Sequence, residues 1–351
     1  MPPASTSSTR ALNAILPLVA AGQPYEAHQK ARTFAARYVK SGQHATAIDV
    51  LFQSARELFK IGQQGSGTDL TVFLLDTYET GQVGVDDESR GRLTQLIALT
   101  GSSGSWRKQV IDRSIAWSAK AGPCPAGDQD LQHYAGEVLY KDGIFDEAEP
   151  HLLASGKRDS ARLLAEMFVQ WSADSDASVA GAFALRGTIP YLQNGNILAA
   201  RTFITTFVSA VLAARPSLVS KLQSESLSVP ADDDTSEVRF CADPLLNFCQ
   251  LAVLACQRAD GERSRAAREN WVKLCGTYQS RGGVLASGDV RVALNEIAQL
   301  YFGIAAPRSQ SENPLGAMLS SMLGGGPPGG GAPQRRMLAP VRGRLDAPGL
   351  D

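Results

Sequence analysis

The feature that most constrains this chain is a helical spacing of apolar residues that continues almost unbroken from about residue 10 to residue 307. In the stretch that begins at Ala45, apolar side chains recur every three or four positions. They are Ile48, Leu51, Phe52, Ala55, Leu58 and Phe59. Such spacing puts them in one stripe along a helix, whereas the period of two that is typical of strands is nearly absent. The sequence therefore predicts an all-α protein.

A second pattern predicts how the helices are joined. A glycine is followed five residues later by an alanine at Gly22/Ala27, Gly42/Ala47, Gly143/Ala148 and Gly195/Ala200. The glycine can end one helix in the left-handed conformation, and the small alanine lets the next helix pack closely. The glycines are separated by 20, 101 and 52 residues, so a fixed 34-residue repeat is excluded. We expect an irregular, tetratricopeptide-like α-solenoid of stacked antiparallel helix pairs.

Composition divides the chain into segments. We expect a disordered lead over residues 1–9, one solenoid half over 10–150 and a second over 151–306. Residues 307–351 are rich in glycine, proline and arginine, and are expected to form a low-complexity disordered tail.

The helical pattern breaks over residues 216–243. Short strand-like runs near 227–240 surround an acidic, turn-rich loop. They predict either a β-hairpin insertion or a disordered insertion between two helices. An insertion in a solenoid often lies on its binding face, so this segment is a candidate contact region.

Bulk properties exclude several classes of function. The net charge of −1 gives no general attraction to nucleic acid or to a membrane surface. The five cysteines form no C-x-x-C pair, so we expect buried thiols and neither disulfides nor a metal site. No apolar stretch is expected to reach the roughly 18 residues that span a bilayer. With no basic leader either, the expected location is the cytosol.

No motif for a catalytic site or a cofactor is present. Gln63 to Thr68 is glycine-rich, but no strand precedes it and no lysine completes a phosphate-binding loop. We expect Gly65 and Gly67 to shape an interhelical turn, with Ser66 or Thr68 as the N-cap of the next helix. The four histidines are scattered, so an enzyme built from His28 or a cysteine nucleophile is the rival hypothesis.

Basic residues gather in the first predicted helix pairs, where acids are few. They are Lys30, Arg32, Arg37, Lys40, Arg56 and Lys60. Spacings of seven and three residues put Lys30, Arg37 and Lys40 on one side of a helix. This side is either a solvated face or a basic patch that steers an acidic protein partner.

Several sequence blocks resemble those of a known family. The blocks that carry the resemblance are Ala21–His28 with Arg32, Arg37–Val39, Ala47–Leu51, Gln64–Leu70, Val85–Asp87 and Tyr301–Ile304. Their order and spacing are similar to the Golgi to ER traffic protein 4 family, which contains the cytosolic solenoid subunit of the machinery that delivers tail-anchored membrane proteins. The resemblance covers roughly residues 10–325 and is strong over the first quarter.

The resemblance implies a non-enzymatic scaffold, without a cofactor, that bridges two partners. The first half would dock on the targeting ATPase, and the second would hold a ubiquitin-like-domain subunit that recruits a client-loaded tetratricopeptide co-chaperone. No direct membrane insertion or nucleic-acid binding is implied. The alternative is a generic helical-repeat receptor for peptides, with an open concave groove.

The resemblance also assigns roles to residues. Anchoring of the ATPase falls on Arg10, Tyr25, Arg37 and Lys40, and modulation of its nucleotide hydrolysis falls on Asp69. The ubiquitin-like-domain subunit would contact Leu227, Val229, Val238 and Phe240. Pro24 departs from the family pattern, because an aromatic residue is expected beside Tyr25.

Overall fold

The computed structural model describes residues 4–102, 104–173, 179–220, 227–229 and 236–305. The chain separates into two compact units, whose described parts are residues 4–155 and 156–305. The second unit therefore begins at residue 156, where the sequence predicted 151. The expected tail over 307–351 lies outside the described residues.

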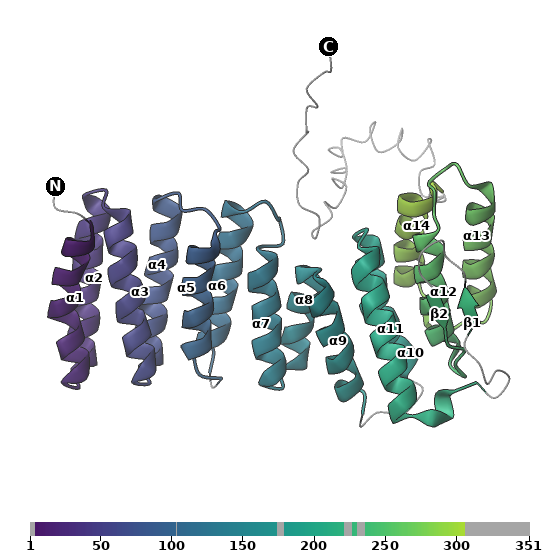
Figure 1. Cartoon of the computed structure of the whole chain (residues 1–351), viewed down its shortest axis with the longest axis horizontal. Coiled ribbons are helices and arrows are strands. Elements are labelled where there is room, and N and C mark those ends of the chain that lie inside the picture. Colours follow the sequence, from purple (N-terminus) through teal and green to yellow (C-terminus); the bar gives the residue numbers. More distant parts are fainter. Residues whose placement is uncertain (1–3, 103, 174–178, 221–226, 230–235, 306–351) are drawn as a thin grey trace, which may run out of the picture. The chain divides into compact units, whose positions relative to one another are not determined.

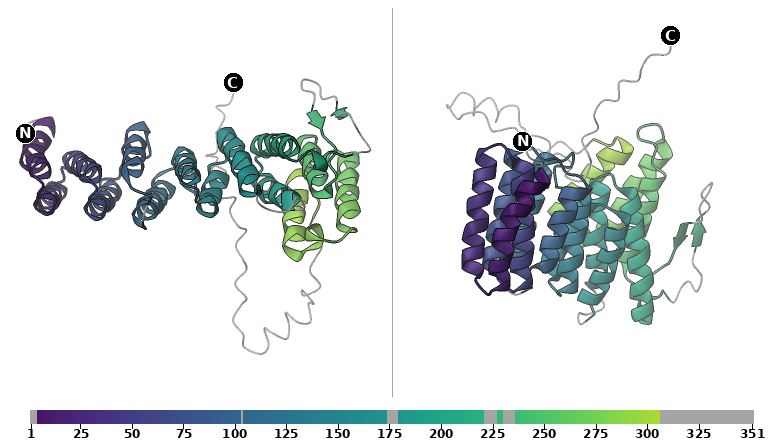
Figure 2. Two further views of the ribbon diagram at one scale, coloured as in Figure 1. Left: turned by 90° about the horizontal axis from the view of Figure 1, so that it is seen from below. Right: turned by 60° about the vertical axis from the view of Figure 1, so that its left-hand side comes forward.

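The first unit is a succession of antiparallel helices that begins at the N-terminus (Figure 1). They are α1 (Ala4–Ala20), α2 (Pro24–Lys40), α3 (His44–Lys60), α4 (Gln64–Thr80), α5 (Asp87–Leu99), α6 (Trp106–Ala121), α7 (Gln129–Lys141) and α8 (Phe145–Ser155). Seen along the helix axes in the left panel of Figure 2, these helices alternate between two rows. A helix such as α3 therefore packs against α2 and α4 and also against α1 and α5. This is the packing of an α-solenoid, as predicted.

The glycine–alanine pattern has the predicted function in the structure. Gly22, Gly42, Gly143 and Gly195 all have φ between +72° and +77°, the left-handed region that side chains with a Cβ rarely adopt. The four partner alanines are fully buried. Glycine thus turns the chain between helices, and alanine lets the second helix approach its neighbour.

The prediction for Gly65 and Gly67 was wrong. A fifth glycine, Gly62, makes the turn with φ +77°, and α4 begins two residues later at Gln64. Both glycines therefore lie in the first turn of α4, and its N-cap is Gln63. A Cβ at Gly67 would lie 2.6 Å from the ring of Phe59, so this glycine takes the place of the pattern's alanine where α3 and α4 pack too closely even for a methyl group.

The expected disordered lead over residues 1–9 is also corrected. Helix α1 begins at Ala4, Ser8 is buried, and the hydroxyl of Tyr38 donates a hydrogen bond to the carbonyl of Ser7 across 3.1 Å. Serine and threonine are poor helix formers, but here the packing against α2 outweighs their intrinsic preference. Residues 1–3 lie outside the described part of the chain.

The second unit contains the remaining helices and a small hairpin. The elements are α9 (Arg158–Trp171), α10 (Ala180–Gln193), α11 (Ile197–Ala214), η2 (Pro216–Leu218), β1 (Leu227–Val229), β2 (Ser236–Val238), α12 (Pro244–Gln257), α13 (Arg265–Gln279), η3 (Val284–Ala286) and α14 (Gly288–Phe302). The rings of Phe168, Phe203 and Phe207 are fully buried and in contact where α9 packs against α11.

Helix α11 departs from the expectation about membrane spans. Its 18 residues have a mean hydropathy of 1.8, which makes it long and apolar enough to cross a bilayer, although 44% of that window is buried in the fold. Its apolar residues pack against α9, α10 and α12. We therefore interpret α11 as the core helix of its unit; in the described residues it alone passes this test.

The predicted hairpin is present. Strand β1 pairs antiparallel with β2, with Leu227 opposite Val238 and Val229 opposite Ser236. Further along the ribbon, Val219 pairs with Cys241, and the amide of Ala242 donates to the carbonyl of Leu218 across 2.7 Å. The insertion between α11 and α12 is thus built on a short β-ribbon.

Candidate partner-binding surfaces

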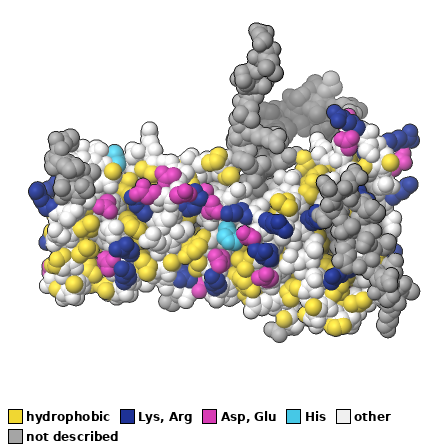
Figure 3. All heavy atoms as spheres, in the orientation of Figure 1, with side chains coloured by type: hydrophobic (Ala, Val, Ile, Leu, Met, Phe, Trp, Pro, Cys, Tyr) yellow, Lys and Arg dark blue, Asp and Glu magenta, His cyan; other side chains and the backbone are white. Residues whose placement is uncertain are grey.

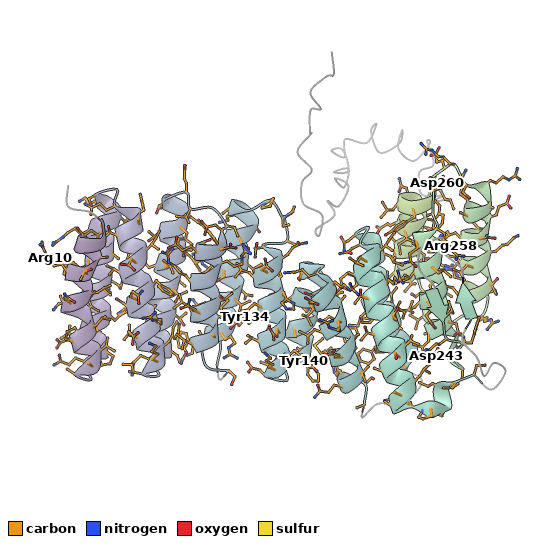
Figure 4. All side chains as sticks on the ribbon, viewed as in Figure 1. Arg10, Tyr134, Tyr140, Asp243, Arg258 and Asp260 are labelled. Carbon is orange, nitrogen blue, oxygen red and sulfur yellow. The ribbon has the colours of Figure 1, made fainter. Side chains whose placement is uncertain are left out.

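Three of the four predicted anchoring residues lie toward the same end of the α1–α2 pair. Two hydrogen bonds fix the register of these antiparallel helices: Tyr38 to the carbonyl of Ser7, and Lys30 to the carbonyl of Ala14. This register brings Arg10 to the same end of the helix pair as Arg37 and Lys40. Figure 4 shows the side chain of Arg10 pointing away from the helices. We call Arg10, Arg37 and Lys40 the basic end.

The basic end carries positive charge that the fold does not neutralise. All three side chains are exposed, and within the described part of the chain no carboxylate lies at ion-pair distance from any of them. Arg37 and Lys40 occupy the last turn of α2, where cations complement the helix dipole by about 0.3–1 kcal/mol each. The local helix thus tolerates these charges and presents them to solvent.

Tyr25, the fourth predicted anchor, is not part of the basic end. It lies in the first turn of α2, twelve residues before Arg37, which corresponds to about 18 Å along the axis. The side chain is 73% exposed. Pro24, which departs from the family pattern, is the first residue of α2. The backbone N–H at this position has no acceptor within the helix, so proline is tolerated there.

Asp69 lies on the same side of α2 as Tyr25 and is held by two donors. The Nε2 atom of His28 lies 2.7 Å from its Oδ2, and Nη1 of Arg32 forms an ion pair with the same oxygen. The guanidinium of Arg32 also lies over the ring of Phe73, 5.6 Å from its centroid. Partial burial would raise the pKa of Asp69, but the hydrogen bonds from Arg32 and His28 outweigh it and lower that pKa. Asp69 is therefore an anion at neutral pH.

This arrangement was not predicted from the sequence, although a signal for it exists. Opposite charges recur at separations of 37 to 41 positions in the first unit, as in Asp69 with Arg32, Asp76 with Arg113, and Glu79 with Lys120. Each such pair joins a helix to the next but one. Figure 3 shows that basic and acidic side chains also lie side by side on the face of the first unit that it presents. The separation is the number of residues from one helix to the next but one, which we call one solenoid step. A search for opposite charges at this separation could have identified Arg32 as a partner of Asp69.

Sequence reasoning also missed two exposed apolar side chains. Ile61, which follows α3, is 46% exposed, and Trp106, which opens α6, is 39% exposed. Because neighbouring helices are antiparallel, both lie at the end of the unit where Tyr25 begins α2. These three are the exposed large apolar residues within the described residues 7–155.

The hairpin residues predicted to contact a partner differ in accessibility. Val238 is only 4% exposed, because β2 packs against α12, and Phe240 is half-buried. The side chains of Leu227 and Val229 lie outside the described part of the structure. Val238 is therefore mainly a core residue. Its small exposed part lines a groove.

That groove has a volume of about 240 Å³ and lies between α11, α12 and β2. Its walls are both apolar and polar, and include Ile204, Val208, Val253, Arg201 and Gln257. The side chain of Gln250 accepts from the amide of Arg239 at 3.0 Å and donates to its carbonyl at 2.9 Å. Asn247 contacts Cys241 in the same two-way manner, at 2.8 Å in both directions. Helix α12 thus fixes the strand that forms one wall of the groove.

The cysteines are not arranged as nucleophiles. Cys249 and Cys256 lie seven residues apart and are buried on one face of α12. Burial raises the pKa of the Cys275 thiol to about 12 and that of Cys241 to about 11. A catalytic thiol needs the opposite shift. In the described residues, no group of three or more His, Cys, Asp or Glu side chains could hold a metal ion.

Fold and surfaces together define a helical-repeat protein with exposed charged and apolar contact surfaces. The family model for Golgi to ER traffic protein 4 matches residues 41–323. Golgi to ER traffic protein 4 of Aspergillus fumigatus is 35% identical over 322 residues, covering 88% of this chain and 87% of the relative. The Schizosaccharomyces pombe protein of that name is 29% identical, covering 86% and 91%, and the Homo sapiens homolog is 27% identical, covering 86% and 83%.

A solved structure agrees with these relatives. The crystal structure of C. therm. Get4 superposes with a TM-score of 0.76 at 34% identity, covering 91% of this chain and 96% of that one. The chain belongs to the Golgi to ER traffic protein 4 family.

Proposed function

We propose that this protein is a cytosolic, non-enzymatic scaffold for the insertion of tail-anchored proteins into the ER membrane. It bridges a targeting ATPase, bound by the first unit, and a ubiquitin-like-domain subunit, bound by the second. Through that subunit it is linked indirectly to a tetratricopeptide co-chaperone. Family membership supports the pathway, and the observation that carries the docking surface is the unpaired basic end formed by Arg10, Arg37 and Lys40.

The physical argument for the first contact is electrostatic. Charges without internal partners keep their full attraction for an acidic surface, whereas the neighbouring cations Arg32 and Lys60 already have carboxylate partners within the chain. Such a surface accelerates association and selects acidic partners. Tyr25 adds an exposed aromatic contact about 18 Å away along α2, so the proposed ATPase contact spans the length of this helix.

The test is a binding titration of the full chain with the targeting ATPase. Reversing two charges, Arg37→Glu with Lys40→Glu, is expected to raise Kd by at least about tenfold, or about 1.4 kcal/mol. Raising the salt concentration is expected to weaken wild-type binding more than binding of the double variant, since fewer charges remain to be screened.

A matched control is available on α13. Arg265→Glu with Lys273→Glu changes the net charge equally, at two exposed positions of the second unit. This variant is expected to bind the ATPase like wild type. The assignment fails if Arg37→Glu with Lys40→Glu leaves Kd unchanged, or if both double variants weaken binding equally.

We assign the ubiquitin-like-domain subunit to the hairpin and its groove. The argument is that a β-ribbon interrupts an otherwise helical unit and forms one wall of a partly apolar groove next to α11 and α12. Val238 contributes to that wall, Phe240 follows it, and Leu227 and Val229 belong to the pairing strand. Partner segments commonly bind such mixed apolar and polar concavities.

A further inference from the structure

The carboxylate of Asp69 is held in a particular way. Both of its donors, Nε2 of His28 and the guanidinium of Arg32, contact the same oxygen, Oδ2. Within the described residues no donor reaches Oδ1, and the side chain remains 42% exposed. An ionised carboxylate has about four acceptor positions, so Oδ1 can still receive a donor from outside the chain.

The two donors are themselves held in place. The side chain of His28 is only 14% exposed and lies one turn before Arg32 on α2. Arg32 is held at two points by α4, through the Asp69 carboxylate and through the ring of Phe73 four residues later. Asp69 therefore has a fixed orientation, because rotating its carboxylate would break two contacts at once.

We propose that His28 and Arg32 are positioning residues that orient the Asp69 carboxylate so that Oδ1 accepts a cationic side chain of the bound ATPase. This inference rests on the proposed function and on the role in modulating nucleotide hydrolysis that the family resemblance assigns to Asp69. It adds two residues and a geometry to that role. The occupant of Oδ1 is identified as a cation because the acceptor is an ionised carboxylate.

The geometry distinguishes positioning from neutralisation. An arginine that only neutralised Asp69 would gain most by engaging both oxygens in the bidentate pairing that guanidinium favours. Here Arg32 shares one oxygen with a second donor and leaves the other oxygen unoccupied. Removal of a positioning residue should therefore reduce the effect of Asp69, whereas removal of a neutralising residue should increase it.

The experiment measures two quantities with the full chain and the ATPase. One is the Kd of the complex, and the other is the change in ATP hydrolysis rate that a saturating amount of the chain causes. Asp69→Asn defines the effect without the carboxylate charge. Arg32→Gln and His28→Ala are expected to lose most of the modulating effect with an unchanged Kd. His28→Gln, which keeps a donor, is expected to restore most of it.

Arg113→Gln is the matched control. It removes an exposed ion pair of the same kind, in which Arg113 of α6 contacts Asp76 of α4 at 2.5 Å, on the side of α4 opposite to α2 along the chain. If the pairs have only a structural role, Arg32→Gln and Arg113→Gln will lower the melting temperature similarly and leave hydrolysis at the wild-type rate. That outcome overturns the proposal.

Two other results would also be decisive. If Asp69→Asn abolishes the modulation while Arg32→Gln and His28→Ala keep or increase it, positioning is wrong and Asp69 retains its role. If Asp69→Asn behaves like wild type while Kd is normal, the regulatory assignment of Asp69 is wrong, and with it the positioning role.

Discussion

At the scale of single residues, buried polar groups show which protonation states the fold requires. His151 of α8 lies mostly out of solvent, and its Nδ1 is 2.6 Å from Oε1 of Gln132 on α7. The amide nitrogen of Gln132 donates to the carbonyl of Ala126 at 2.5 Å, so the amide oxygen faces the imidazole. Burial lowers the pKa of His151; smaller opposing effects come from Asp112 and Glu147, and Lys108 lowers it further.

This lowered pKa predicts acid destabilisation of the α7–α8 pair. The unfolded chain takes up a proton near the ordinary pKa of 6.5, whereas folded His151 does so only at lower pH. Stability from this group is therefore complete above pH 6.5 and is lost as the pH falls through its folded pKa. Urea unfolding of wild type is expected to lose more stability between pH 7.5 and 5.5 than His151→Gln. Equal losses in the two proteins would contradict the account.

At the scale of elements, the closeness of helix packing depends on glycines inside helices. Gly187 lies in α10 directly beneath the buried ring of Phe203 on α11, and a Cβ at this position would overlap the ring. Gly136 of α7 has the same relation to Leu152 of α8, with a separation of 2.7 Å. A glycine inside a helix weakens that helix, but at these two positions it allows a close contact with the neighbouring helix.

Gly187→Ala is expected to destabilise the protein by about 1–3 kcal/mol, because the ring of Phe203 must move within a close-packed core. Gly276→Ala is the matched control, since Gly276 lies in the interior of α13 and no atom lies within 4 Å of the point that its new Cβ would occupy. Because alanine has a better helix propensity than glycine, Gly276→Ala should stabilise the protein by about 0.5–1 kcal/mol. Urea unfolding measures the free energy of unfolding of both variants. If Gly187→Ala leaves it unchanged, the α10–α11 contact is looser than described.

The sequence predicts helices well where apolar period and turn glycines agree, as in α2, α3 and α8. It failed at Gly67, because only the packing of Phe59 explains a glycine within α4. It failed again at the start of α1, since the contact of Tyr38 with Ser7 is a tertiary one. For the candidate sites, spacing within one helix grouped Arg37 with Lys40. It does not bring His28 and Arg32 of α2 to Asp69 of α4, because that contact depends on how the two helices pack.

At the scale of the whole molecule, two units carry two different kinds of surface. The first presents the basic end and the oriented carboxylate of Asp69, and the second presents a groove bounded by a β-ribbon. Separate surfaces on separate units allow two partners to bind without competing for residues. The proposed bridging function requires two such surfaces, whereas a receptor for peptides requires only one concave groove.

The most direct test of this account is to mix the full chain with the targeting ATPase and the ubiquitin-like-domain subunit and to measure the mass of the resulting complexes by size-exclusion chromatography with light scattering. We expect one complex that contains all three proteins, and Arg37→Glu with Lys40→Glu should release the ATPase from it while the ubiquitin-like-domain subunit stays bound. Mutually exclusive binding of the two partners, or release of both by that double variant, would contradict the bridging function.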